Sequence, residues 1–378
     1  MKKFCLLCLL LFLTLISLPQ SAAAQIKFSA LTTLGYTGLD RESKINGMFR
    51  GDDPFNPVRV TLFMEDWINP RLGVFIEFLW DQGASHSGSD TKPRINGAYA
   101  VARPFDTDAF LLKIGMIPSS FGTWAPRTYA DRNPLVGLPL AYHYRTPLKS
   151  SQVPLDVDEL RTWRTNRGLP LAYDSCWDHG VEAFGFISWF EYSLALTKSS
   201  ISSPAAYNNG GFQVLTRLGV KPLTGLRLGV SLERGSYLDK GATGLPAGKK
   251  EEDAYQEAIN FDFGYSYGHT QIYSELAKIW WESPNLEDDL TSTSWYVELK
   301  QVLFPGFYAA VRYNRFTYNS LTGSDGVSFD WGDNVTRVES GLGYTFTKGV
   351  LLKLDWQHNR IDTRPNVDLL CTQLVLTF

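Results

Sequence analysis

The side chains of this chain that could do chemistry are mainly fixed charges at patterned positions. Seven basic residues gather between Pro118 and Cys176, namely Arg127, Arg132, Arg145, Lys149, Arg161, Arg164 and Arg167. Acidic residues offset part of this charge, among them Asp131, Asp156, Asp158 and Glu159. Charges that border a confined water-filled space select ions through their field, whereas charges on an external loop are only solvated. Solvation is the commoner role of any single loop arginine, but the segment as a whole favours the first interpretation.

A second set of charges recurs at every other position of short segments elsewhere in the chain. Its members are Arg59, Lys113, Arg217, Arg227, Arg312, Arg337 and Lys353, against Glu65, Glu77, Glu233, Glu275, Glu298, Glu339 and Asp355. The structural alternative is cross-strand ion pairing, at roughly 0.2–1 kcal/mol per pair. The candidate site residues are therefore Arg127, Arg132, Arg145 and Arg164, together with Lys113 and Arg312.

Other kinds of chemistry find little support. The five histidines lack metal-ligand spacing, and the Gly-x-Ser-x-Gly motif of hydrolases is absent. His358 near Asp362, and His86 near Ser85 and Asp90, are the only hints of a hydrolytic pair. We therefore expect no catalytic residue, no bound metal and no cofactor.

The first residues have the pattern of an export signal. Lys2 and Lys3 precede an apolar run from Phe4 to Leu18, and Ala22, Ala23 and Ala24 supply the small residues of a cleavage site. Residues 1–24 are thus expected to be removed, which leaves residues 25–378 as one domain. Without the two lysines, 34 basic side chains stand against 39 acidic ones, a net charge of −5. This balance argues against a nucleic-acid partner.

The rest of the chain has the periodicity of β-strands. No apolar run of 18 residues follows the signal, aromatic residues make up 14% of the chain, and apolar side chains alternate with polar ones. In one example Leu226, Leu228 and Val230 alternate with Arg227 and Gly229. Repeated mid-segment charges on the second face suit either a sheet with one face in water or a barrel with water inside.

The connections favour the barrel. The pattern predicts sixteen strands at about 26–37, 58–67, 72–82, 94–103, 109–117, 177–187, 190–198, 211–220, 225–234, 256–265, 269–279, 293–303, 307–317, 335–345, 350–359 and 369–378. Short turns follow the even strands and long polar loops follow the odd ones, as in a transmembrane antiparallel β-barrel. Closure leaves no sheet edge in lipid, which offers no hydrogen-bond partner. We expect Thr32, Leu62, Ile76, Leu112, Leu228, Val311 and Leu374 to face lipid.

The chain resembles the Gram-negative outer-membrane porins. Phe378, preceded by the alternating Leu376, Leu374 and Thr372, is similar to the aromatic-ended last strand of those proteins, which serves as an assembly signal. The run from Leu112 to Pro118, with Phe121-Gly122, is similar to a motif of the phosphate-selective porin O and P family. The resemblance implies sixteen strands, a homotrimer in the outer membrane, contacts with lipid and lipopolysaccharide, and passive diffusion of small solutes. The mixed lumenal charges depart from the arginine and lysine ladder of the O and P family.

The longest connection should control passage. Residues 118–176 are far longer than any other gap and contain Trp124, Tyr129, Tyr142, Tyr144 and Trp163, which can pack. The resemblance implies that this segment folds into the lumen and narrows it. Its basic excess predicts a weak preference for anions, while the overall charge favours cations. An outer-membrane barrel enzyme of lipase or protease type, and a non-conducting structural or adhesin barrel, are the alternatives.

Overall fold

The computed structural model describes residues 26–38, 58–81, 93–164, 166–173, 177–198, 200–203 and 209–378. The predicted export signal, His86 and Cys176 lie outside these residues. Within the described residues, no helix is long and apolar enough to cross a membrane.

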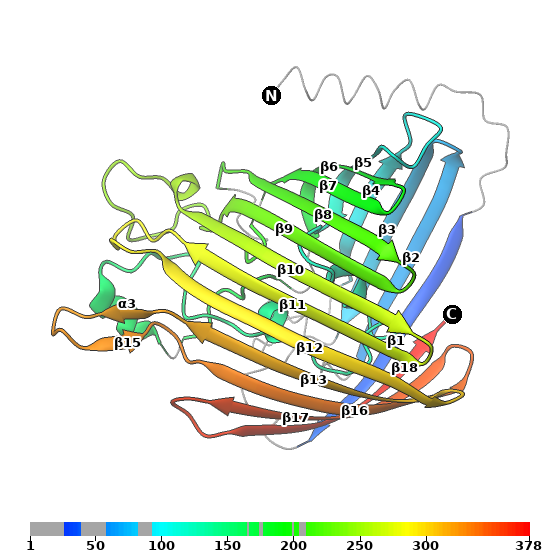
Figure 1. Cartoon of the computed structure of the whole chain (residues 1–378). Coiled ribbons are helices and arrows are strands. Elements are labelled where there is room, and N and C mark those ends of the chain that lie inside the picture. Colours follow the sequence, from blue (N-terminus) through cyan, green and yellow to red (C-terminus); the bar gives the residue numbers. More distant parts are fainter. Residues whose placement is uncertain are drawn as a thin grey trace.

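Sixteen antiparallel strands close into one barrel, in which β1 pairs with β18 (Figure 1). They are β1 Lys27–Gly38, β2 Val58–Asn69, β3 Leu72–Asp81, β4 Arg94–Ala102, β5 Leu111–Pro118, β6 Trp177–Ile187, β7 Phe190–Thr197, β8 Gln213–Leu223, β9 Leu226–Ser236, β10 Tyr255–Tyr267, β11 Thr270–Trp281, β12 Leu290–Phe304, β13 Phe307–Tyr318, β16 Val335–Thr347, β17 Val350–Ile361 and β18 Val367–Thr377. The predicted fold class and strand count are confirmed, and the predicted boundaries differ by at most three residues.

The strands alternate between an outer apolar face and an inner polar face. Leu62 is 50% exposed on the outside, whereas its neighbour Thr61 is 3% exposed. On β9, Leu232 points outward and Glu233 is buried inside. The structure places all seven residues that were predicted to face lipid on the outer face.

The two ends of the barrel differ, as Figure 1 shows. Two-residue turns join β2 to β3, β6 to β7, β8 to β9, β10 to β11, β12 to β13 and β16 to β17. The same end also carries an eight-residue connection from β4 to β5, where a short turn was predicted, and the other end carries the longest connections. One of them, between β13 and β16, contains a two-stranded sheet of β14 Ser320–Thr322 and β15 Ser328–Asp330, which was not predicted.

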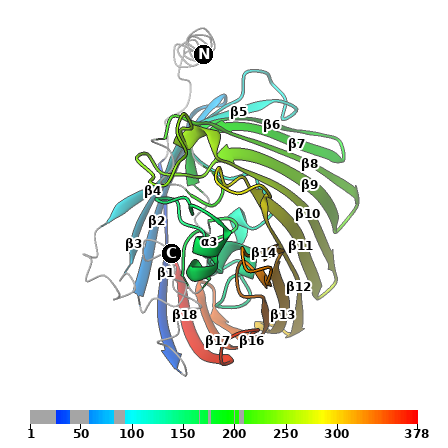
Figure 2. The same ribbon diagram turned by 90° about the vertical axis from the view of Figure 1, so that its left-hand side faces the viewer.

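The helices of the described chain are short and lie in connections. Three of them, η3 Ala125–Arg127, α2 Leu140–His143 and α3 Val157–Trp163, follow β5, and η5 Glu251–Asp253 precedes β10. Asp156 caps α3 by accepting a hydrogen bond from the backbone N–H of Glu159 at 2.7 Å. Figure 1 and Figure 2 show α3 at the long-connection end of the barrel, in front of its opening.

The main hydrophobic core lies inside the barrel rather than between two sheets. Trp124, Tyr142 and Leu160 of the connection after β5 pack in one cluster with side chains of the wall and of other connections, such as Trp281 and Trp331. All five side chains are at most 2% exposed. The connection after β5 is therefore a folded part of the barrel interior.

Candidate functional site

The segment after β5 forms what we call the inserted loop, residues 119–164 and 166–173. It leaves the wall through a turn at Gly122, where φ is +64°. A Cβ at this position would lie 2.6 Å from Tyr142 Oη and 2.9 Å from Asn260 Nδ2, so glycine is required by both conformation and space. The Gly122 N–H donates to Ser231 Oγ of β9 at 3.1 Å, which attaches the start of the loop to the wall.

Glu275 of β11 makes the next attachment. Its Oε1 accepts the backbone N–H of Thr123 at 2.6 Å and the Thr123 hydroxyl at 2.7 Å. Its Oε2 accepts the Tyr142 hydroxyl. One buried carboxylate therefore joins two parts of the inserted loop that are nineteen residues apart in sequence.

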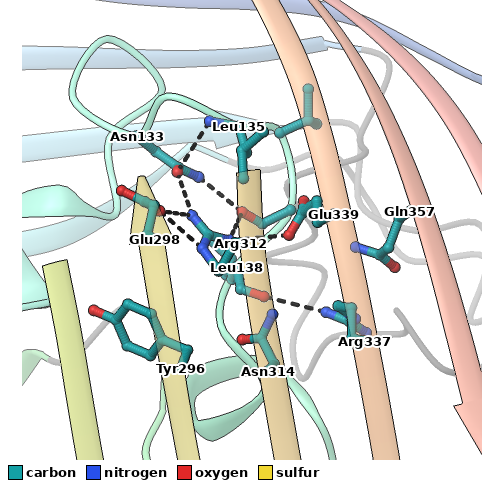
Figure 3. Close-up of polar contacts among 12 residues, drawn as sticks. Asn133, Leu135, Leu138, Tyr296, Glu298, Arg312, Asn314, Arg337, Glu339 and Gln357 are labelled. Carbon is teal, nitrogen blue, oxygen red and sulfur yellow. Dashed lines mark hydrogen bonds and ion pairs between the residues drawn. The ribbon is translucent and has the colours of Figure 1, made fainter. Parts of the chain in front are cut away.

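Arg312 of β13 is the centre of a larger network, drawn in Figure 3. Its guanidinium donates to the carboxylates of Glu298 and Glu339 on the neighbouring strands. It also donates to the Gly137 carbonyl at 2.9 Å and to Asn133 Oδ1 at 2.8 Å, both in the inserted loop. The side chain is fully buried. A buried guanidinium needs all of these acceptors, because unpaired donors away from water are costly.

The adjacent strands continue this attachment with backbone groups of the loop. Lys353 of β17 donates to the carbonyls of Ala130, Asn133 and Leu135 at 2.8–3.1 Å. Asp355, two residues along β17, accepts the N–H groups of Val136 and Gly137 at 2.8 and 3.2 Å.

Arg337 of β16 donates to the Leu138 carbonyl at 3.1 Å, as Figure 3 shows. The lumenal charges of β13, β16 and β17 thus satisfy the irregular backbone of residues 130–138, which has no sheet partner of its own. The sequence placed these charges in the lumen but gave no sign of this role.

The structure separates the six predicted site residues into two groups. The first group has four residues that hold the inserted loop together, and the second has two residues that line a cavity. Arg127 pairs with Glu298 and lies over the Tyr273 ring at 3.9 Å, and Arg312 lies in the network above.

The other two residues of the first group are held in the same way. Arg145 is buried and donates to the Gly168 carbonyl at 2.7 Å, and Arg164 pairs with Asp333 at 3.1 Å. These four residues hold the inserted loop together. Only Lys113 and Arg132, among the six, line the large cavity described next.

A cavity of about 660 Å³ remains between the inserted loop and the wall. Ser119, Thr123 and Pro126 border it on the loop side. Its other end reaches the short-turn rim, where Phe378 is 77% exposed. The backbone of Phe378 exchanges hydrogen bonds with Ala30 of β1, so the last residue extends the barrel seam.

A second, smaller cavity of about 50 Å³ lies farther in, and Leu31 and Tyr129 line both cavities. The Tyr129 hydroxyl reaches across from the inserted loop and donates to Glu77 of β3 at 2.5 Å. Its ring meets Phe63 edge-on at 5.4 Å. Burial, and then the negative charge of Glu77, raise the pKa of Tyr129, so the phenol stays neutral and keeps donating. Tyr129 of the inserted loop and Leu31 of the wall therefore lie between the two cavities.

In the structure His358 has a different acidic partner from the one that the sequence suggested. The imidazole of His358 contacts Asp368 at 2.9 Å rather than Asp362, and its ring stacks on Trp356. Trp356 is 40% exposed on the outer face.

Comparisons with known proteins agree with the barrel fold. No protein-family model matches the chain, and no curated protein does. Among solved structures, OmpT of Vibrio cholerae in its trimer form has a TM-score of 0.59 at 8% identity, over 94% of this chain and 100% of that chain. OmpF of Salmonella typhi, in complex with daunomycin, has a TM-score of 0.59 at 12% identity, over 93% and 97%.

An anion-selective porin from Comamonas acidovorans is similar to the same extent. It has a TM-score of 0.58 at 7% identity, over 94% of this chain and all of that chain. At these identities the likeness is one of fold. The chain thus has the sixteen-stranded barrel architecture found in outer-membrane porins.

Proposed function

We propose that this chain is an outer-membrane porin through which small hydrophilic solutes diffuse passively. The observation that carries the proposal is the inserted loop. It is joined mainly to lumen-facing residues of β11 to β17, yet it leaves a cavity of about 660 Å³ along the wall from β1 to β9. A sixteen-stranded barrel is wide enough for an aqueous channel, and the loop restricts that channel to one side.

The size of the remaining space sets the class of solute. A cavity of several hundred Å³ accommodates one molecule of a few hundred daltons. The Tyr129–Glu77 contact then makes the narrow part of the path, because Tyr129 lines both cavities and Glu77 lines the smaller one. Solutes larger than a small oligosaccharide should be excluded.

The charges along the path support weak ion selectivity. Lys113 pairs with Glu182 at 2.7 Å, and Arg217 pairs with Glu191 and Asp262. Opposite charges at such distances cancel beyond about one Debye length, which is ~10 Å at 0.1 M salt. Most of the basic side chains in residues 118–176 form ion pairs or hydrogen bonds within the protein. The proposal therefore includes no strong preference for anions.

The remaining parts of the proposal concern location and assembly. Residues 1–24 act as a cleaved export signal, and residues 25–378 form the barrel domain in the outer membrane. The apolar outer face would contact lipid, and the long connections would contact lipopolysaccharide. A homotrimer is proposed because the barrel resembles OmpT of Vibrio cholerae, whose structure is described as a trimer form.

We propose no hydrolytic activity. His358, the described residue of the two hints, contacts an acidic side chain on the outer face. A hydrolase would also need a serine or an activated water at that imidazole. In the part of the chain that the structure describes, no serine contacts His358.

Swelling of liposomes that contain the purified, refolded protein tests the proposal. Neutral sugars of increasing size, from a pentose to a tetrasaccharide, separate diffusion from charge effects. We expect rapid entry of the pentose, slower entry of a disaccharide and exclusion of the tetrasaccharide. Liposomes with heat-denatured protein serve as the control. Impermeability to the pentose in liposomes with correctly folded barrel would refute the proposed function.

A further inference from the structure

The wall of the large cavity carries a group of aromatic rings between β2 and β6. Phe63 of β2, Phe75 of β3, Tyr99 of β4 and Trp177 of β6 line the cavity, and we call these four residues the aromatic face. Phe75 lies 6.2 Å from Phe63, 5.0 Å from Tyr99 and 6.0 Å from Trp177 between ring centroids. The rings therefore form one continuous surface.

The local structure holds these rings in place. The planes of Phe75 and Trp177 are 11° from parallel. A Cβ on Gly97 of β4 would lie 2.5 Å from the Trp177 ring, so the absence of a side chain at Gly97 makes room for the indole. Trp177 is 7% exposed, whereas Phe63, Phe75 and Tyr99 are half-buried. The aromatic face is thus held in place by its neighbours, and part of its ring area remains open to the cavity.

The opposite part of the lumen wall carries charged side chains in place of aromatic rings. The inner faces of β12, β13, β16 and β17 carry Glu298, Arg312, Glu339 and Asp355, and the inserted loop covers them. On the opposite wall the rings of Phe63, Phe75 and Tyr99 remain partly exposed beside a space that water can fill. Apolar area in a wet, concave site favours a ligand that removes it from water.

Polar groups beside the aromatic face narrow the class of ligand. Lys113 lies over the Phe184 ring at 4.1 Å and pairs with Glu182. Ser119 and Ser120 border the same space from the inserted loop. Four basic and four acidic side chains line the cavity, so it offers hydrogen-bond donors and acceptors without an excess of either charge.

From these contacts we propose that the cavity is a binding subsite for an uncharged solute that combines a flat aromatic ring with hydroxyl groups. The ring stacks on the aromatic face, and the hydroxyl groups reach the Lys113–Glu182 pair and the loop serines. The proposal rests on the proposed function, because a subsite of this kind gives a diffusion channel a preferred solute.

Two glucosides that differ in one group test the proposal on the unaltered protein. Phenyl β-D-glucoside carries the ring, and methyl β-D-glucoside carries the same hydroxyl groups without it. Calorimetric titration of the full-length barrel in detergent should show saturable binding of the phenyl compound, at least tenfold tighter than any binding of the methyl compound. Benzoate and benzylammonium should bind more weakly than the phenyl glucoside, because the lining has no net charge to offer them.

A pair of matched variants locates the binding. Phe75→Ala removes the ring in the middle of the aromatic face and should weaken phenyl glucoside binding about tenfold or more. Phe75→Tyr should restore it. Phe263→Ala removes the same side chain from the outer face of β10, where Phe263 is 37% exposed, and should leave binding unchanged.

The outcomes separate the subsite from the channel. Equal binding of the two glucosides, or no binding of either, overturns the subsite even if liposomes are permeable to sugars. Equal losses in Phe75→Ala and Phe263→Ala also overturn it. Impermeable liposomes refute the channel, but the titration in detergent still decides whether the subsite exists. If Phe75→Ala does not fold, the comparison of the two glucosides on the unaltered protein decides alone.

Discussion

Replacing Arg312 with methionine should release the inserted loop from the wall without opening the barrel. In the native structure Arg312 is the cation between Glu298 and Glu339, and it also holds the Gly137 carbonyl. Glu298 keeps Arg127 in the variant, but Glu339 loses its cation while the loop still shields it from water. Movement of the loop away from the wall would let water reach this carboxylate.

The size of the effect follows from the burial of the pair. Removing one partner of a buried ion pair costs roughly 3–5 kcal/mol, because the other charge is left uncompensated. At about 1.4 kcal/mol per factor of ten, the open form of the loop should become roughly a hundred to a few thousand times more populated. The double variant with Glu339→Gln should recover part of the loss, since no buried carboxylate is then left alone.

Hydrogen exchange of the refolded protein measures this opening directly. The N–H groups of Val136 and Gly137 donate to Asp355, so their exchange reports on the attachment of the loop. Arg227→Met is the matched control, because Arg227 is 41% exposed and pairs with Glu191 of the wall. Unchanged exchange of residues 130–140 in Arg312→Met, or equal acceleration in both variants, would show that the network does not hold the loop.

Three further predictions concern other parts of the structure. Leu228→Arg should destabilise the barrel in lipid vesicles by ~2–4 kcal/mol, because Leu228 is 38% exposed on the outer face, whereas Arg227→Leu should have little effect; urea unfolding with equal shifts for both would refute the assigned faces. Deletion of Phe378, which is 77% exposed, should lower the amount of barrel assembled in cells far more than it lowers the stability of the refolded protein, and parallel losses in both measurements would count against an assembly signal. Gly122→Ala should destabilise the start of the inserted loop by roughly 1–3 kcal/mol because φ is +64°, and exchange of the Thr123 amide should accelerate; native exchange rates would contradict the strain argument.

Much of the barrel could be predicted from the sequence because each strand carries its own signal. Because successive side chains of a strand point to opposite faces, the neighbours Arg227 and Leu228 are predicted to lie on opposite sides of the wall. The alternation of short turns and long connections between these segments then predicts how many strands the barrel has. The β14–β15 hairpin was not predicted, since three residues per strand are too few to show a period.

The role of the lumenal charges could not be predicted, because it depends on contacts between distant residues. Arg127 and Glu298 pair across 171 positions, and Arg312 reaches the Gly137 carbonyl across 175. No spacing rule joins such partners. The predicted role also treated the charges as lining water, whereas the irregular backbone of the inserted loop needs donors and acceptors from the wall.

Tyr129 shows the same limit. The sequence identified it as an aromatic residue able to pack within residues 118–176, and Glu77 as a lumenal charge. Their hydrogen bond across the lumen depends on how the inserted loop folds back against β3. No pattern in the sequence brings these two side chains together at the boundary between the cavities.

Single-channel recording in planar lipid bilayers tests the central claim most directly, with the unaltered protein compared with Tyr129→Ala and Tyr129→Phe. The unaltered protein should give discrete conductance steps, and their reversal potential in a salt gradient should lie close to zero. Tyr129→Ala should give larger steps, because the side chain between the two cavities is removed, while Tyr129→Phe keeps the ring and should stay close to the unaltered protein. An absence of steps with folded barrel in the bilayer, or steps of the same size in all three proteins, would contradict a channel whose width the inserted loop controls.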